Sequence, residues 1–266
     1  MVRIGGAQIP VTKDLEKNIK HIKEAINWAA ENKVEYLLTP EGSLSGYMNS
    51  FDTVNDMDID SLLIDLQAHA ALAQVGLILG TEIIETKPFG LVKQSQLRYF
   101  DQQGIAVGKY AKQMTIPGEC SHPGDGPEII TMQHMSHTAR LDIKMGSFIC
   151  NDMWGQLDNV SCVPKDLFLY SNEQVNIIFH ASNGFRGDDA GKNADERSSM
   201  RDFSDLHLWN ASRYMVPILT VDNCYNINGE PDSGPTSSSS GVISNGEWLV
   251  KAKPSGTDYF YYDFKF

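Results

Sequence analysis

The chain has 266 residues, enough for one large domain or two small ones, and its 41% hydrophobic content supports a substantial core. Lys and Arg total 22 against 34 Asp and Glu, and the net charge of −12 repels phosphates, which argues against nucleic-acid binding. No stretch approaches the roughly 18–20 apolar residues that span a bilayer, and the N-terminus lacks the apolar region of a signal peptide, so we expect a cytoplasmic protein that does not bind membranes.

Strands and helices alternate along most of the chain, which is typical of an α/β domain. Apolar runs predict strands, in chain order, over residues 3–9, 34–39, 75–84, 91–100, 105–110, 143–150, 175–180, 215–221, 241–250 and 259–266. Apolar positions at helical spacing predict helices over residues 14–31, 59–74, 163–173 and 196–213. In the last helix, the expected core positions are Met200, Phe203, Leu206 and Ala211.

No linker and no repeat divides the chain, so we expect a single α/β domain over residues 1–266. Strands joined by helices and strands joined by hairpins are both present, which predicts mixed sheets. About a dozen strands in a chain of this length favour two packed sheets with helices outside.

Three polar residues stand where an expected strand ends. Cys150 closes the apolar run of residues 143–150, and Glu41 follows the run of residues 34–39. Lys112 lies in the polar break after the strand of residues 105–110, before a Pro-Gly loop. A nucleophile, a base and a cation on three strand ends indicate an active site rather than three unrelated positions.

A thiol with an ordinary pKa near 8.5 is mostly protonated at pH 7, so Cys150 needs a base or a cation. Glu41 supplies the first and Lys112 the second. A histidine is the more usual partner of a catalytic cysteine, and His180, at the end of a strand, is the best candidate for that alternative. No Cys-x-x-Cys pair and no His pair at zinc-ligand spacing is present, so we expect no metal site and no cofactor.

These residues lie in motifs that resemble the nitrilase superfamily, the carbon–nitrogen hydrolases, over nearly the whole chain. The segment PEGSLSGY of residues 40–47 is similar to the family segment with the general-base glutamate. GKYAK of residues 108–112, followed by Pro-Gly and Glu119, is similar to the lysine segment and its second glutamate, and GSFICND of residues 146–152 to the nucleophile segment. The spacing is 71 residues from Glu41 to Lys112 and 38 from Lys112 to Cys150.

The resemblance implies a four-layer α-β-β-α sandwich with two mixed sheets that forms a homodimer through a helical face. It also implies a thiol amidohydrolase without metal or cofactor, in which Glu41 is the base, Cys150 forms a thioester, and Glu119 orients Lys112 or the substrate. Lys112 and the backbone N–H of Asn151 would stabilise the oxyanion. The expected substrate-binding residues are Tyr47, Asn151, Trp154 and Asn183.

Departures from the family pattern leave the substrate open. Gln113-Met-Thr stands where His-Leu is frequent, and Met-Trp-Gly-Gln follows Asp152 in place of a nearby Pro-Glu. The triplet Cys-Asn-Asp is similar to the branch that cleaves N-carbamoyl amino acids. We expect hydrolysis of a small linear amide or N-carbamoyl compound with release of ammonia. The alternatives are nitrile hydrolysis at the same site, a non-catalytic oligomeric scaffold and a redox-sensing cysteine protein.

Overall fold

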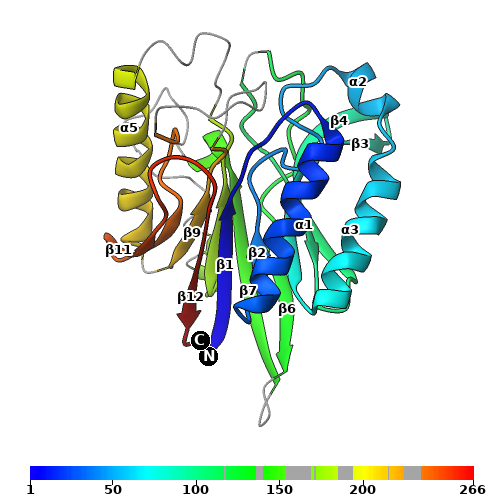
Figure 1. The fold of residues 1–266 in the computed structure, drawn as a ribbon. Helices are drawn as coiled ribbons and strands as arrows, with labels where there is room; N and C mark the ends of the chain where they lie inside the picture. Colours follow the sequence, from blue (N-terminus) through cyan, green and yellow to red (C-terminus); the bar gives the residue numbers. More distant parts are fainter. Residues whose placement is uncertain are drawn as a thin grey trace.

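The computed structural model of the chain describes residues 1–116, 118–135, 140–153, 169–170, 172–184, 194–214, 216–224 and 235–266. Two six-stranded sheets pack face to face, with helices α1 and α3 covering one outer side and α5 the other (Figure 1). The layer order is therefore α-β-β-α, as expected. In these residues no helix is both long and apolar enough to cross a membrane.

The first sheet has the order β12-β1-β2-β3-β4-β5. β1 pairs in parallel with β2 and β2 in parallel with β3, whereas the β12, β4 and β5 pairings are antiparallel, so the sheet is mixed. The bounds of its strands are β1 Val2–Gln8, β2 Tyr36–Leu38, β3 Gly76–Lys87, β4 Gly90–Phe100, β5 Ala106–Ala111 and β12 Asp258–Phe264. The antiparallel β1–β12 pair places the two chain ends side by side (Figure 1).

The second sheet repeats this arrangement, with the order β11-β10-β9-β8-β7-β6 and a parallel trio β7-β8-β9. Two expectations were wrong here. The expected strand over residues 241–250 is a hairpin, because Asn245 and Gly246 both have positive φ and reverse the chain. The strand β6 was not among the expected strands. The bounds are β6 Ile130–Met135, β7 Arg140–Ile149, β8 Ile177–Ala181, β9 Ile218–Val221, β10 Gly241–Ser244 and β11 Glu247–Lys251.

The helices follow the predicted periodicity closely. α1 (Leu15–Glu31) starts after Asp14, whose side chain accepts a hydrogen bond from the Lys17 amide and so caps the helix. α3 (Ile59–Ala73) and α5 (Ala194–Ser212) match the other two long predictions, and a short α2 (Phe51–Asp56) was not predicted. Of the helix expected over residues 163–173, residues 169, 170 and 172 are helical and most of the rest lies outside the described residues.

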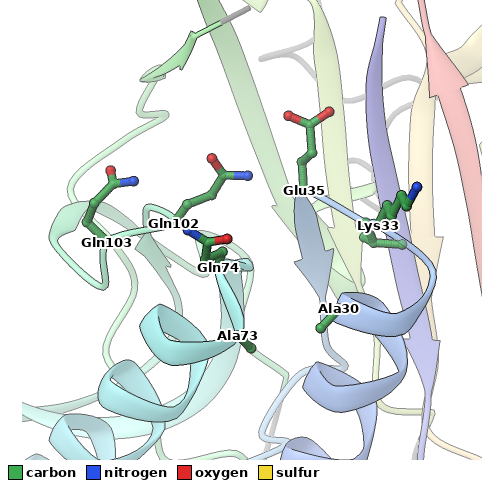
Figure 2. Close-up of a pocket in the computed structure, with 8 residues that line it drawn as sticks. Ala30, Lys33, Glu35, Ala73, Gln74, Gln102 and Gln103 are labelled. Atoms are coloured by element: carbon green, nitrogen blue, oxygen red, sulfur yellow. The ribbon is translucent and has the colours of Figure 1, made fainter.

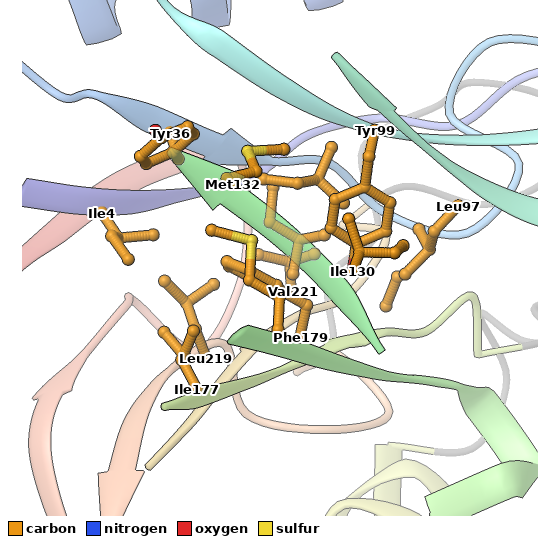
Figure 3. Packing of buried hydrophobic residues seen from close by; sticks show 14 of the residues in the cluster. Ile4, Tyr36, Leu97, Tyr99, Ile130, Met132, Ile177, Phe179, Leu219 and Val221 are labelled. Atoms are coloured by element: carbon orange, nitrogen blue, oxygen red, sulfur yellow. The ribbon is translucent and has the colours of Figure 1, made fainter. Parts of the chain in front are cut away.

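The core has three parts because both faces of each sheet are buried. The central part lies between the two sheets and contains Ile4, Tyr36, Tyr99 and Phe179 (Figure 3). The outer parts lie under α1 and α3 and under α5. Successive residues of β8 alternate between the central part and the α5 side, which explains why the parallel strands read as continuous apolar runs.

The expected core face of α5 was partly wrong. Met200, Phe203 and Leu206 are 52%, 42% and 53% exposed, whereas Leu208 and Ala211 are fully buried. The helix has apolar side chains on more than one face, and its periodicity alone does not show which of them faces the sheet.

Candidate active site

The strand directions bring the three predicted residues to one edge of the sandwich. Glu41 lies just after β2, Lys112 directly after β5, and Cys150 directly after β7. β5 is antiparallel to β4, which is antiparallel to β3, so β5 runs in the same direction as β1, β2 and β3. Within the first sheet, Glu41 and Lys112 therefore leave their strands at the same edge, where open α/β sheets place ligand sites.

A close approach between two segments holds the Glu41 loop on the sheet. Gly80 of β3 passes directly under this loop, and a Cβ atom at Gly80 would lie only 2.0 Å from the carbonyl oxygen of Pro40. Only glycine fits at this position. The Leu44 amide also donates a hydrogen bond to the Gly80 carbonyl at 3.1 Å, which fixes the loop in place.

Lys112 lies between two carboxylates in the buried interior. Its Nζ is 2.8 Å from Glu41 Oε1 and 3.0 Å from Glu119 Oε2, and it donates a longer hydrogen bond of 3.5 Å to the hydroxyl of Tyr47. Glu41, Lys112 and Glu119 are each at most 1% exposed. The ammonium is thus held by two acids, from the loop after β2 and the loop after β5.

Burial and the opposite charge of the neighbour shift the pKa of Glu41 in opposite directions, and likewise that of Lys112. Burial raises the pKa of Glu41 to about 7, with the Lys112 charge working against the rise and Glu119 adding to it. Burial disfavours the ammonium of Lys112, yet the surrounding acidic groups, Glu41 first among them, together outweigh this and raise the pKa of Lys112 well above its usual value. Lys112 therefore stays cationic, while Glu41 exchanges a proton near neutrality.

Each carboxylate has one oxygen engaged and one without a hydrogen-bond partner in the described part of the chain. Glu41 Oε1 binds Lys112 and accepts a hydrogen bond from Ser95 Oγ at 3.2 Å, and Glu119 Oε2 binds Lys112 and the Ile116 amide. Glu41 Oε2 and Glu119 Oε1 are buried and unpaired among these residues. Buried polar atoms without partners are costly, so these two oxygens are the natural contacts for a ligand or a transferred proton.

Cys150 lies in a tight turn, and its backbone conformation sets the direction of its side chain. It opens the short 3-10 helix Cys150–Met153 directly after β7, with a φ of +46°. This left-handed conformation is uncommon for a non-glycine residue and is frequent at functional sites. The thiol is partly buried against the central core, and its Sγ lies 3.8 Å from Asn151 Oδ1.

The Cys150 thiol is protonated at neutral pH in this structure. Burial raises the pKa of the Cys150 thiol to about 12, against the attraction of the Lys112 charge and a hydrogen bond from Ser182. The charges of Lys112 and Glu41 both act on the sulfur. A thiol of this kind needs a base to become a nucleophile.

Asp152 stabilises the turn at Cys150 by accepting hydrogen bonds. Its Oδ2 accepts hydrogen bonds from the Ile149 amide and the Tyr110 hydroxyl, and its Oδ1 accepts from the amides of Gln113 and Met114. The side chain thereby ties the nucleophile turn to the segment that carries Lys112.

The model of the family described as "Carbon-nitrogen hydrolase" matches residues 2–184, which is more than half of the chain. The chain belongs to the carbon–nitrogen hydrolase family. No curated protein matches it in sequence.

Solved structures share the fold of this carbon–nitrogen hydrolase at low sequence identity. An amidase from Nesterenkonia sp. is 17% identical with a TM-score of 0.72, and the match covers 99% of this chain and 90% of that chain. A mutant of the amidase from Nesterenkonia sp. AN1, with acrylamide added to its active-site cysteine, is 16% identical at the same TM-score, covering 100% of this chain and 94% of that one. A further mutant, described as from the nitrilase superfamily, is also 16% identical, with a TM-score of 0.72 and coverage of 99% and 92%.

Of the other expected site residues of the hydrolase, Tyr47 contacts Lys112 and Asn183 contacts the backbone of Glu41. Tyr47 lies at the Lys112 end of the group, 5% exposed. Asn183, after β8, donates a hydrogen bond from Nδ2 to the backbone oxygen of Glu41 at 3.1 Å and accepts one from Asn223, so it holds the Glu41 loop against the second sheet. Trp154 lies outside the described residues.

His180, the alternative partner of Cys150, lies beside the backbone of this residue. His180 Nε2 lies 3.4 Å from the backbone oxygen of Cys150, and Nδ1 lies 2.8 Å from Thr220 Oγ1. Burial lowers the pKa of His180 to about 4, so the ring is neutral at pH 7. His180 contacts the main chain of Cys150 through its ring.

Sequence reasoning missed three buried polar residues around the hydrolase site, Ser95, Ser182 and Lys93. Ser95 bonds Glu41, Ser182 bonds Cys150, and Lys93 bonds the backbone of Glu119. One signal was present. β4 carries four polar residues in succession from Lys93 to Gln96 within an apolar strand pattern, and each is at most 2% exposed.

A separate hollow lies at the other end of the strands (Figure 2). Its volume is about 330 Å³, and its lining residues are Ala30, Lys33, Val34, Glu35, Ala73, Gln74, Gln102 and Gln103. Glu35 precedes β2 whereas Glu41 follows it, so this hollow is not part of the candidate active site. Among the residues that the structure describes, no group of three or more His, Cys, Asp or Glu is placed to hold a metal ion.

Proposed function

We propose that the protein hydrolyses a small linear amide or N-carbamoyl compound through a Cys150 thioester and releases ammonia. The observation that carries this proposal is the buried Lys112 shared by Glu41 and Glu119, each with one oxygen unpaired among the described residues, within electrostatic reach of a thiol. Membership of the carbon–nitrogen hydrolase family supports it.

In the first step Glu41 removes the thiol proton as Cys150 attacks the carbonyl carbon. The C–S bond forms, the carbonyl π pair moves to oxygen, and the proton passes to Glu41. Lys112 and the backbone N–H of Asn151 are proposed to stabilise the oxyanion. A neutral resting thiol agrees with a transfer that accompanies attack, because burial holds the pKa of Cys150 at about 12.

In the second step the C–N bond breaks and ammonia leaves with the proton from Glu41. A water molecule then gives a proton to Glu41 and attacks the thioester. The C–S bond breaks, the acid leaves, and the sulfur takes the proton from Glu41 to restore the thiol. One carboxyl group acts as base and then acid in each half of the reaction. Such a group works best with a pKa near the working pH, and burial raises the pKa of Glu41 to about 7.

Glu119 supports an amide over a nitrile as substrate. Its Oε1 is buried and has no partner among the described residues, so it is placed to accept a hydrogen bond. The –NH₂ of an amide or carbamoyl group donates such a bond, and a nitrile nitrogen has no hydrogen to donate. A nitrile would leave this buried carboxylate oxygen unsatisfied, which is costly.

Ammonia release from matched panels tests this assignment. Short aliphatic amides, N-carbamoyl amino acids and the corresponding nitriles are incubated with the protein, with Cys150→Ala as the blank. We expect ammonia from the amide or the carbamoyl series at a rate about 10²-fold or more above that from the nitriles. Turnover of nitriles alone would overturn the amide assignment. No turnover of any member, by a protein whose thiol is intact, would favour the scaffold alternative.

We further propose that the chain is one hydrolase domain over residues 1–266 and a cytoplasmic homodimer that pairs through α5. The β1–β12 pair joins the two ends of the chain, which supports the domain assignment. α5 carries exposed apolar side chains at a spacing of three residues, Met200, Phe203 and Leu206, with exposed fractions of 52%, 42% and 53%. An apolar surface of this kind is typical of a face that a second subunit covers.

The oligomeric state tests the α5 face. We expect light scattering to give twice the chain mass of 29.6 kDa for the unmodified protein and a single chain mass for Leu206→Asp, because a buried charge would oppose pairing. Ile64→Asp on α3 is the matched control, since Ile64 is 65% exposed on the helix layer of the other sheet. Dissociation by Ile64→Asp but not by Leu206→Asp would place the interface on the α3 side.

A further inference from the structure

A second buried ion pair lies behind the candidate site. Glu82 of β3 and Lys93 of β4 have side chains with no exposed area, and Lys93 Nζ is 2.8 Å from Glu82 Oε1. Neither residue takes part in the proposed chemistry. Replacing a buried ion pair by apolar side chains is often neutral or stabilising, so stability alone is a weak reason for this one.

Lys93 uses all three of its ammonium hydrogens on specific acceptors. Besides Glu82, Nζ donates to the backbone oxygen of Asn49 at 2.5 Å and to the backbone oxygen of Glu119 at 2.7 Å. The two carbonyl groups belong to different loops. One loop follows β2 and carries Glu41 and Tyr47, and the other follows β5 and carries Lys112 and Glu119.

Glu82 contacts the first of these two loops, the one that follows β2. Its Oε2 accepts hydrogen bonds from the Asn49 amide at 3.1 Å and from Asn49 Nδ2 at 2.8 Å, and its own amide donates to Ser45 Oγ at 2.7 Å. The pair therefore joins two site loops to each other through the strands β3 and β4. We call this set of contacts the Glu82–Lys93 clamp.

We propose that Lys93, held in place by Glu82, is a positioning residue that fixes the backbone of Glu119 and the loop of Glu41 relative to each other, so that both carboxylates meet Lys112. The backbone oxygen of Glu119 is the anchored atom, and its Oε2 is 3.0 Å from Lys112 Nζ. A shift of this backbone moves the carboxylate directly. Misplacement by about 1 Å is enough to cost about 100-fold in rate.

The clamp also acts on the site through charge. The negative charge of Glu82 contributes to the rise in the pKa of Glu41, after burial and Glu119. Removing this charge should therefore lower the pKa of Glu41. That effect distinguishes the clamp from a merely structural pair of residues, which would leave the pH profile of the reaction unchanged.

The closest matched control is another ion pair across the same two strands. Arg98 of β4 is paired with Glu85 of β3 at 3.1 Å, and its guanidinium also donates a hydrogen bond to Gln96 of β4 at 3.0 Å. Arg98→Met thus breaks a β3–β4 ion pair without releasing a carbonyl group of either site loop. An effect that Arg98→Met shares with the clamp variants comes from the loss of an ion pair between β3 and β4, not from a change in the site loops.

The main test compares Glu82→Gln/Lys93→Met with Arg98→Met, and it rests on the proposed amide hydrolysis. The double variant keeps the shape of both side chains and leaves no unpaired buried charge. We expect kcat for the amide to fall about 10- to 100-fold with KM within about threefold. Amide hydrogen exchange should also become faster in residues 116–122. A double variant with the kcat and exchange of Arg98→Met would overturn the proposal.

A single variant keeps the test decisive if the double variant does not fold. For Glu82→Gln we expect the acidic limb of kcat/KM to move to lower pH, with the limb of Arg98→Met unmoved. An unmoved limb in Glu82→Gln would overturn the positioning role. Failure of the proposed function is separate, because it would appear in the unmodified protein as no ammonia from amides or carbamoyl compounds, or as amide hydrolysis that persists in Cys150→Ala.

Discussion

Replacing Cys150 by alanine is expected to reduce amide hydrolysis to the level of the uncatalysed reaction. The thioester needs the sulfur, and the hydroxyl groups beside the Glu41–Lys112–Glu119 group, those of Ser95 and Tyr47, cannot form one. Loss of the nucleophile of a hydrolase that acts through an acyl-enzyme costs about 10⁶-fold in kcat. Ammonia release from the best substrate of the panel measures this loss.

The matched control for that result is Cys120→Ala. Cys120 is exposed, follows Glu119 directly and, like Cys150, has a positive φ, so its replacement imposes the same backbone requirement near the same loop. We expect Cys120→Ala to keep its activity within about threefold, because the thiol of an exposed residue makes no contact with the Lys112 group. In a mass spectrum after quenching with substrate, an acyl adduct on Cys120 rather than Cys150 would contradict the assignment of the nucleophile.

The positions of Glu41, Lys112 and Cys150 were predictable because they depend on strand direction. Apolar runs mark strands that are buried on both faces, and residues at the carboxyl ends of parallel strands meet at one edge of a sheet. β2, β5 and β7 each end next to one of the three residues. The order of these motifs along the chain was enough to recognise the family.

Contacts that depend on tertiary packing were not predictable from pattern. The Glu82–Lys93 pair joins residues on adjacent strands whose side chains look like ordinary surface charges in the sequence. The exposed Met200 and Leu206 were expected in the core, because the periodicity of α5 does not tell which of its apolar faces packs on the sheet. β6 was missed because its polar residues, such as Gln133 and His134, weaken its apolar pattern.

The charges of the site also explain why one ammonium serves two acids. Burial raises the pKa of Glu41, the Lys112 charge works against this rise, and the charge of Glu119 adds to it. Glu41 is left with a pKa of about 7, whereas the pKa of Lys112 lies well above its usual value. Glu41 therefore accepts a proton near neutrality, and Lys112 beside it stays cationic.

Replacing Glu41 by glutamine is expected to lower kcat/KM for the amide about 10³-fold or more at pH 7. Glutamine keeps the size and the hydrogen bond from Ser95 but takes no proton, so neither attack nor ammonia release is assisted. In the unmodified protein we expect kcat/KM to rise with pH through about 7, as Glu41 loses its proton, and then to stay level. The level region should extend to alkaline pH because the pKa of Lys112 lies well above its usual value and that of Cys150 at about 12.

The pH profile of Glu41→Gln then separates the roles of the two acids. The limb near pH 7 should disappear, and the residual rate should rise in alkaline solution, where the thiol begins to ionise without a base. Glu119→Gln is the matched variant: it keeps Glu41, so the limb should remain and move to lower pH, because Glu119 raises the pKa of Glu41. If Glu119→Gln loses the limb and Glu41→Gln keeps it, the general base is Glu119, and Glu41 serves only to hold Lys112.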